Sequence, residues 1–231
     1  FEAIPIEVSG YLFLAAGIRL GVLLIRQPVM PRGLGTLIQF VPVSASIVLL
    51  IRAAHFAVPG IWGSVFMILA AFIALSSAIF WLQSENEIQG RPYWIVGLGA
   101  FAFAAALQRL AVASEAWSLA LLFSGALLGL FSMRHRWLMI LIGFGVVGFS
   151  SLPLTMAWEG SALFFRLPWG YRIIFFVAFA LLIVGYLRHA RRSATVTEGL
   201  ERWMWIVYPI GLALLPLTHF GLIYIKWRLG F

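Results

Sequence analysis

The sequence contains no cysteine and few charged residues. Without cysteine the chain cannot form a disulfide, a thiolate metal site, an iron–sulfur cluster or a cysteine nucleophile. Charged residues make up 10% of the 231, whereas soluble domains carry roughly 25%. A soluble fold of this length could not bury the remaining apolar surface, so the shortage of charge indicates a protein whose solvent is lipid.

Long apolar runs are abundant. Hydrophobic residues make up 63% of the chain, its mean hydropathy is +1.01, and its 22 glycines and 10 tryptophans suit membrane helices. Inside lipid, backbone polar groups must form hydrogen bonds within the protein, which helices and closed barrels allow. The runs lack the alternation of polar and apolar residues that is typical of barrel strands. We therefore predict an all-α, polytopic transmembrane bundle forming a single domain, 1–231. A spanning helix needs about 20 apolar residues, which gives about eight spans: 8–26, 35–55, 60–83, 92–112, 115–133, 137–158, 169–188 and 203–226.

The net charge is +8, and 15 of the 16 basic residues are arginine. Most of them flank the apolar runs, which predicts anchoring to lipids and orientation in a membrane rather than a nucleic-acid partner. With eight spans, the loops on one side carry nine basic residues and those on the other side carry six. The positive-inside rule then places the richer side in the cytoplasm, and both termini outside the cell inner membrane.

Arg19 and Glu159 are candidates for an ion path, and Pro153 is a candidate for a helix break. Arg19 lies in the middle of the first run, where a charge costs about 2.5–3.5 kcal/mol on insertion scales. It either faces the bundle interior on an ion path, or it snorkels or pairs with a partner for a structural purpose. Pro153 should kink or break the sixth run near 152–160, and Glu159 follows it. Glu159 is either a protonatable carboxylate beside the break or an interfacial residue at a helix end.

The other polar candidates have plain structural interpretations. Ser44 and Ser46 either line a polar path or bond backward to their own helix. His55 and His219 titrate near neutral pH, but a lone membrane histidine more often serves packing. Ser124 has no convincing base, and paired His–Glu metal spacing is absent. We therefore expect no catalytic residue, metal or cofactor, and a chain that is not an enzyme by itself.

Three segments carry a resemblance to a known family. RLGVLLIR at 19–26 and SLPLTMAWEG at 151–160 resemble motifs in the C-terminal half of the antiporter-like membrane subunits of respiratory complex I and of the related Mrp antiporters. Arg19 falls on the Lys position of the family's seventh helix and Arg26 on its His position. A further segment, 42–52, opens with Pro-Val-Ser and ends in Leu-Leu-Ile-Arg like the family's next helix. The order of elements matches helices seven to fourteen.

This sequence lacks several of the residues that carry protons in the family. Members move protons along buried Lys, His and Glu, and the resemblance implies such a path through Arg19, Arg26, Ser44 and Glu159. The family's Lys of the second helix falls near Ser44, the run at 115–133 has no interior charge, and Glu159 lies two residues early. Arginine stays protonated and relays protons poorly. The resemblance therefore implies a degenerate copy.

Several functions follow as hypotheses. The first is a membrane subunit of a complex I-type, quinone-linked assembly, which takes part in proton translocation or supports it structurally and binds other membrane subunits and lipids. The second is a purely structural subunit of another membrane complex, in which Gly97, Gly99, Gly143, Gly145 and Gly148 permit close helix contacts. A small-solute transporter would gain support from inverted repeats, and none is clear between residues 1–115 and 116–231.

Overall fold

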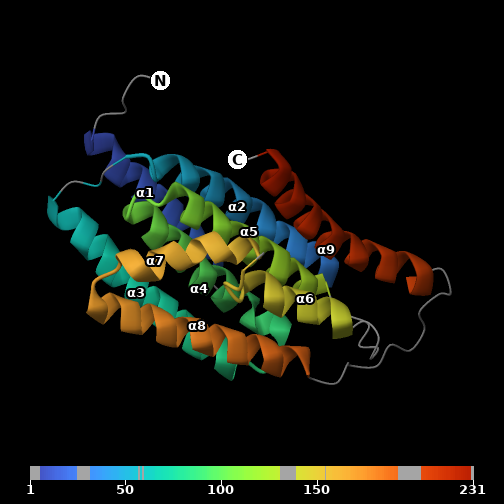
Figure 1. Ribbon diagram of the computed structural model, residues 1–231. Helices are drawn as coiled ribbons and strands as arrows, with labels where there is room; N and C mark the ends of the chain where they lie inside the picture. The colour runs from blue at the N-terminus through green and yellow to red at the C-terminus, as the bar shows by residue number, and fades with distance from the viewer. Residues whose placement is uncertain are drawn as a thin grey trace.

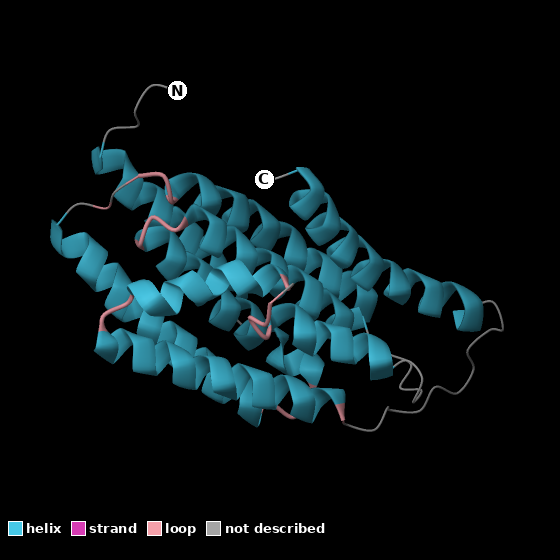
Figure 2. Ribbon diagram, viewed as in Figure 1, coloured by secondary structure: helices cyan, strands magenta, loops and turns pink. Residues whose placement is uncertain are grey.

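The computed structural model describes residues 6–24, 32–56, 58, 60–130, 139–153, 155–191 and 204–229. Within these ranges the regular elements are all helices, and no strand occurs (Figures 1 and 2). In chain order the elements are α1 (Ile6–Gly21), the short 3₁₀ helix η1 (Val22–Leu24), α2 (Arg32–Ala53), α3 (Gly60–Gln83), α4 (Glu87–Leu107), α5 (Ala111–Leu130), α6 (Met139–Phe149), the 3₁₀ helix η2 (Met156–Ser161), α7 (Ala162–Arg166), α8 (Trp169–Ala190) and α9 (Met204–Leu229).

The helices run back and forth along one long axis, with α4 at the centre of the bundle (Figure 1). α4 contacts α1, α2, α3, α5 and α8, and it is buried along almost its whole length from Trp94 to Ala106. Small residues allow this packing. A Cβ atom added at Gly97 would lie 3.3 Å from Leu182 of α8, and one at Gly99 would lie 3.2 Å from Leu20 of α1.

Aromatic side chains fill the space around α4. The ring of Trp94 lies 5.0 Å from that of Phe149 and 5.3 Å from that of Tyr186. Nearer the other end of α4, the ring of Phe101 lies 5.0 Å from that of Trp117. These contacts tie α4 to α5, α6 and α8, and they make it the common core of the fold.

Three of the described helices are long and apolar enough to cross a membrane, namely α3, α5 over Ala111–Leu128, and α8. α3 occupies the whole of the predicted run 60–83, and α8 begins at 169 as predicted. The predicted count of about eight spans is not reached on these criteria. α1 ends at Gly21 beside the middle of α4, and the predicted sixth run 137–158 is divided into α6 and a second piece made of η2 and α7.

The contacts of the α6 glycines differ from one another. A Cβ atom at Gly148 would lie 2.6 Å from the ring of Phe123, and one at Gly145 would overlap Tyr186. A Cβ atom at Gly143 would meet nothing within 4 Å. Close helix contact, predicted for all three, therefore applies to Gly145 and Gly148 among the described residues.

We expect Gly185→Val to destabilise the bundle. A Cβ atom at Gly185 of α8 would lie 2.5 Å from the Trp81 ring of α3, and overpacking of this kind costs about 1–3 kcal/mol. Gly170→Val on the same helix is the matched control, because a Cβ atom there meets nothing within 4 Å. Thermal unfolding in detergent, followed by tryptophan fluorescence, should show a lower midpoint for Gly185→Val alone. Equal midpoints would contradict the packing described for α3 and α8.

Candidate functional site

The C-terminal ends of α3 and α8 meet in a polar cluster. The last four carbonyl groups of any α-helix lack partners within that helix. In α3, the carbonyl of Trp81 accepts hydrogen bonds from Ser84 Oγ at 2.7 Å and from His189 Nε2 at 2.9 Å. The carbonyl of Leu82 accepts from the Arg188 guanidinium. The last turn of α8 therefore supplies the cap of α3, and its basic residues stand at the negative end of the α3 dipole.

Ser84 and His189 have the composition of a hydrolase pair but not its geometry. Ser84 Oγ lies 3.1 Å from His189 Nε2, within the range of a nucleophile and its base. However, Nε2 also lies 2.9 Å from the Trp81 carbonyl oxygen, which can only accept, so this nitrogen carries the hydrogen. A protonated nitrogen cannot take a proton from Ser84. The pair therefore serves as a helix cap rather than as catalytic groups.

Two charged residues are buried next to this cap. Glu87 and Arg91 are 5% and 3% exposed, and their spacing of four residues places them on one face of α4. Both line a cavity of about 10 Å³ together with Trp81, Trp94, Gly125 and Leu128. A cavity of this size is close to the minimum that holds one water molecule. Burial of these charges marks this end of α4 as the most polar part of the described interior.

The sequence contained a signal for this cluster. The spacing Glu87-x-x-x-Arg91 is that of a stabilising helix pair, and Asn86 before it is a favourable N-cap. Asn86 Oδ1 does accept from the backbone N–H of Ile88 at 3.1 Å and of Gln89 at 2.9 Å. Because the apolar run is predicted to begin at residue 92, the sequence places Arg91 among the basic residues that flank the runs, whereas the structure places it inside α4.

Several buried polar side chains bond across helices to backbone carbonyls. Trp117 Nε1 donates to Gly160 at 2.9 Å, and Ser124 Oγ donates to Gly145 at 2.7 Å. Each bond joins α5 to one half of the divided sixth run. Similar bonds run from Trp81 Nε1 to Leu182 at 3.2 Å, from Trp94 Nε1 to Leu121 at 3.4 Å and from the Tyr186 hydroxyl to the Ser124 carbonyl at 3.2 Å.

The break in the sixth run lies between the two ends of the bundle, on its outer surface (Figure 1). α6 ends at Phe149, and Ser151 has a positive φ of 55°, a conformation that is uncommon outside glycine. Pro153 follows in the turn, and helical geometry resumes at Met156. The interruption therefore lies where the proline-based expectation placed it, with α6 ending four residues before Pro153.

The ion-path candidates do not converge. Arg19 is exposed on the outer face of α1 and does not face the bundle interior. Ser44 Oγ bonds back to the Phe40 carbonyl of its own helix at 2.9 Å, and Glu159 is exposed in η2. Arg26 lies outside the described residues. Across the described parts of the chain, no hydrogen bond or ion pair joins any two of Arg19, Ser44 and Glu159.

The two histidines that the sequence singles out, His55 and His219, lie in different environments. His55 is exposed, whereas His219 of α9 is 3% exposed and stacks on Phe123 of α5, with ring centroids 3.9 Å apart. This arrangement matches the packing interpretation of His219. Ser46 Oγ, like Ser44, bonds to its own helix, at the Pro42 carbonyl, at 3.1 Å.

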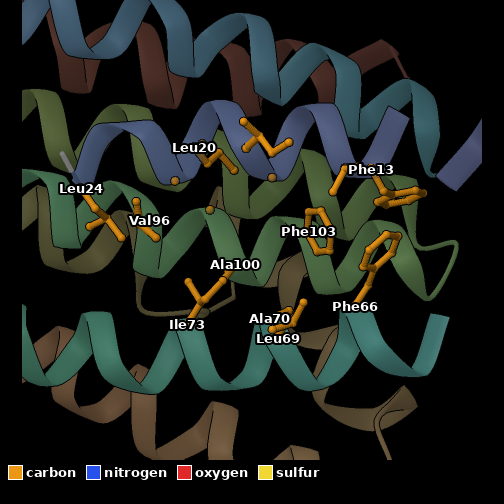
Figure 3. Close-up of a pocket in the computed structure, with 15 residues that line it drawn as sticks. Phe13, Leu20, Leu24, Phe66, Leu69, Ala70, Ile73, Val96, Ala100 and Phe103 are labelled. Atoms are coloured by element: carbon orange, nitrogen blue, oxygen red, sulfur yellow. The ribbon is translucent and has the colours of Figure 1, made fainter. Parts of the chain in front are cut away.

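A cleft of about 240 Å³ lies between α1, α3 and α4 (Figure 3). Its lining includes Phe13, Leu20, Phe66, Val96 and Phe103, and every residue around it is apolar or glycine. Such a lining offers neither a charge nor a hydrogen-bonding side chain. The cleft is therefore suited to hydrocarbon and cannot conduct an ion.

In the described ranges, no three or more His, Asp or Glu side chains gather in a group that could hold a metal ion. In comparisons with protein families, with curated proteins and with solved structures, the chain matches none. The functional argument therefore depends on the geometry and on the sequence motifs.

We expect His189→Leu to weaken the α3 cap. Leucine cannot donate to the Trp81 carbonyl, and loss of one buried hydrogen bond costs about 1 kcal/mol. His189→Gln keeps a donor and should retain part of the stability, and His55→Leu is the exposed control. Unfolding midpoints in detergent should fall in the order wild type and His55→Leu, then His189→Gln, then His189→Leu. A His189→Leu protein as stable as the wild type would contradict a capping role.

Proposed function

We propose that the chain is a multi-pass membrane protein. α3, α5 and α8 have the length and hydropathy for spanning, and large apolar side chains stand uncovered on outer faces, among them Phe72 at 69% and Phe165 at 80% exposure. Soluble monomers rarely expose contiguous apolar patches beyond a few hundred Å². Lipid would cover these faces without cost, and the arginine-rich ends of the bundle would lie in the two interfaces.

We further propose that the chain is a membrane subunit of a larger, complex I-type assembly, in which it supports proton translocation structurally. The single observation that carries the subunit role is the exposed break between α6 and η2. Leu152 is 54% exposed and Pro153 is also exposed. Irregular backbone at membrane depth is tolerated only where protein buries it or water lines it.

The depth of the break follows from its neighbours. The Phe149 ring, just before the break, lies 6.2 Å from that of Phe179, which is near the middle of α8. Gly160, just after it, bonds to Trp117 near the start of α5. The turn between them thus sits inside the span of α5 and α8 rather than at a bundle end. A partner subunit over this outer face would remove the break from lipid.

The buried polar side chains are consistent with a structural role of the chain in the assembly. The buried charges Glu87 and Arg91 and the imidazole of His189 all lie at one end of the bundle. His189 caps a helix, and the buried His219 stacks on an aromatic ring. The cleft beside α1 is apolar throughout. No chain of titratable side chains therefore crosses the described interior from end to end.

The complex I-type identity rests on the sequence resemblance at 19–26, 42–52 and 151–160. The interrupted helix at 149–156 is compatible with that resemblance, and broken membrane helices occur in transport proteins generally. Arginine in place of lysine at position 19, and a back-bonded serine at position 44, fit a copy that has lost relay groups.

Membrane insertion and orientation can be tested with single cysteines, because the chain has none of its own. Glu85 is exposed just after the C-terminal end of α3, and Arg166 is exposed just before the N-terminal end of α8. These two ends of the bundle are separated by the length of α8, about 33 Å for 22 residues. In intact spheroplasts a membrane-impermeant maleimide should label Arg166→Cys, and it should label Glu85→Cys only after the membrane is opened. Labelling of both from one side would contradict the proposed topology.

The subunit role can be tested in native membranes with a tagged chain. On a native gel the wild-type chain should migrate with a complex much larger than its own 25.7 kDa. In vesicles containing that complex, Ser44→Ala and Glu159→Gln should leave quinone-linked proton movement at the wild-type level, since neither lies on a path.

Two results would contradict the proposal. Migration of the wild-type chain alone would exclude a subunit role. A fall in proton movement for either variant, at unchanged abundance of the complex, would replace the structural role with a conducting one.

A further inference from the structure

An open pocket of about 400 Å³ lies where α3 ends and α4 begins. Its lining combines one carboxylate, two aromatic rings and three neutral polar side chains, from Glu85, Phe80, Tyr93, Gln83, Ser84 and Gln89. Glu85 is exposed and forms no hydrogen bond or ion pair with any described residue. The pocket therefore presents a negative charge without a partner, next to the amide oxygens of two glutamines.

This pocket lies at the height of lipid headgroups in the proposed bundle. α3 has the length and hydropathy of a spanning helix and ends at Gln83, so its C-terminal end belongs at a membrane–water interface. The rings of Phe80 and Tyr93 pack there with their centroids 5.3 Å apart, and tyrosine is typical of this depth. A lipid headgroup is therefore the ligand that is most available to the pocket.

The pocket and the apolar cleft beside α1 follow one seam between α3 and α4. On α3, Phe80 of the pocket lies seven residues after Ile73 of the cleft, and on α4, Tyr93 of the pocket lies three residues before Val96 of the cleft. Residues three, four or seven apart share one face of a helix. The cleft therefore continues the pocket toward the middle of the bundle, and we call the two together the α3–α4 seam.

The length of the α3–α4 seam matches one acyl chain. Half of a hydrocarbon core of about 30 Å is about 15 Å, which is about ten residues of helix at ~1.5 Å each. Ten residues before Phe80 along α3 is Ala70, which lines the cleft. Beyond it the cleft ends at three packed aromatic rings, those of Phe13, Phe66 and Phe103 (Figure 3).

We propose that the α3–α4 seam binds one phospholipid of the phosphatidylethanolamine kind. Its primary ammonium group binds Glu85, and one of its acyl chains lies in the apolar cleft. This inference rests on the proposed membrane location of the chain, and it does not depend on the subunit role.

The chemistry of the pocket selects a primary ammonium group. Such a group carries three N–H donors and no acceptor, and the side-chain oxygens of Glu85, Gln83 and Gln89 are acceptors. Aromatic faces also attract cations, and the rings of Phe80 and Tyr93 complete the lining. A choline headgroup has no N–H to donate, and an anionic headgroup would be repelled by the Glu85 carboxylate.

Native mass spectrometry of the delipidated full chain, titrated with phospholipids of matched acyl chains, tests the headgroup. The wild-type chain should bind one phosphatidylethanolamine at least tenfold more tightly than phosphatidylglycerol, with phosphatidylcholine between them. Glu85→Gln should lower the affinity for phosphatidylethanolamine about tenfold, because the counter-charge of the ammonium is lost. Glu115→Gln is the matched control and should change nothing, since Glu115 lies near the start of α5, away from the pocket.

A second pair of variants tests the acyl chain. Gly21 lines the cleft, and a Cβ atom added there meets nothing within 4 Å. Gly21→Leu should therefore fill the cleft without a clash and lower the affinity for phosphatidylethanolamine about tenfold. Gly10→Leu on the same helix is the control, because its Cβ atom also meets nothing within 4 Å and Gly10 is not part of the cleft lining.

Equal affinities for phosphatidylethanolamine and phosphatidylglycerol would overturn the inference, as would a Glu85→Gln affinity within twofold of the wild type. A folded Gly21→Leu chain with wild-type affinity would remove the acyl chain from the cleft. If Gly21→Leu does not fold, Glu85→Gln still decides, because its position is exposed. The maleimide test separates this failure from failure of the membrane proposal: one-sided labelling of Glu85→Cys with unselective lipid binding would leave the membrane location intact.

Discussion

The structure depends on the need to satisfy polar groups inside an apolar bundle. Where two helix ends meet, the carbonyls of Trp81 and Leu82 take donors from Ser84, His189 and Arg188. Within the bundle, indole and hydroxyl groups of α3, α4, α5 and α8 find carbonyls on neighbouring helices. Two features of the outer surface have no covering element among the described residues, the turn at Leu152–Pro153 and the guanidinium of Arg19. The Leu152 carbonyl accepts from Thr155, but the turn remains irregular backbone, and both features would lie at membrane depth in the proposed bundle.

These two features give the proposed function its physical basis. Indole and hydroxyl groups inside the bundle pair with carbonyls across helices, and polar groups on its outer surface should likewise have a partner, because an unpaired polar group in an apolar medium is costly. The simplest account is that the outer surface is completed by other subunits, as it would be in a complex I-type assembly. Under this account His189 holds α8 to the end of α3, and the chain contributes shape and contacts rather than a relay.

The helical fold class and the placement of α3 and α8 could be predicted from apolar runs, because a run of membrane length admits few alternatives. The division of the sixth run was expected from Pro153, yet its extent depends on local turns such as the positive φ of Ser151, which the sequence does not reveal. The direction of Arg19 could not be predicted either. Which face of α1 packs on α4 is decided by Gly17, Leu20 and Gly99, and only tertiary packing selects that face over its opposite.

Hydrogen–deuterium exchange at the break tests most directly whether other protein covers this outer surface. The backbone amides of Ser151 and Leu152 would be compared in the intact native assembly and in the isolated chain in nanodiscs, because those of Ser150 and Thr155 are already hydrogen-bonded within the chain. Coverage by a neighbouring subunit predicts slow exchange in the assembly and markedly faster exchange in isolation. Equal exchange rates in the two states would contradict the account, because they would show that no neighbouring subunit covers the break.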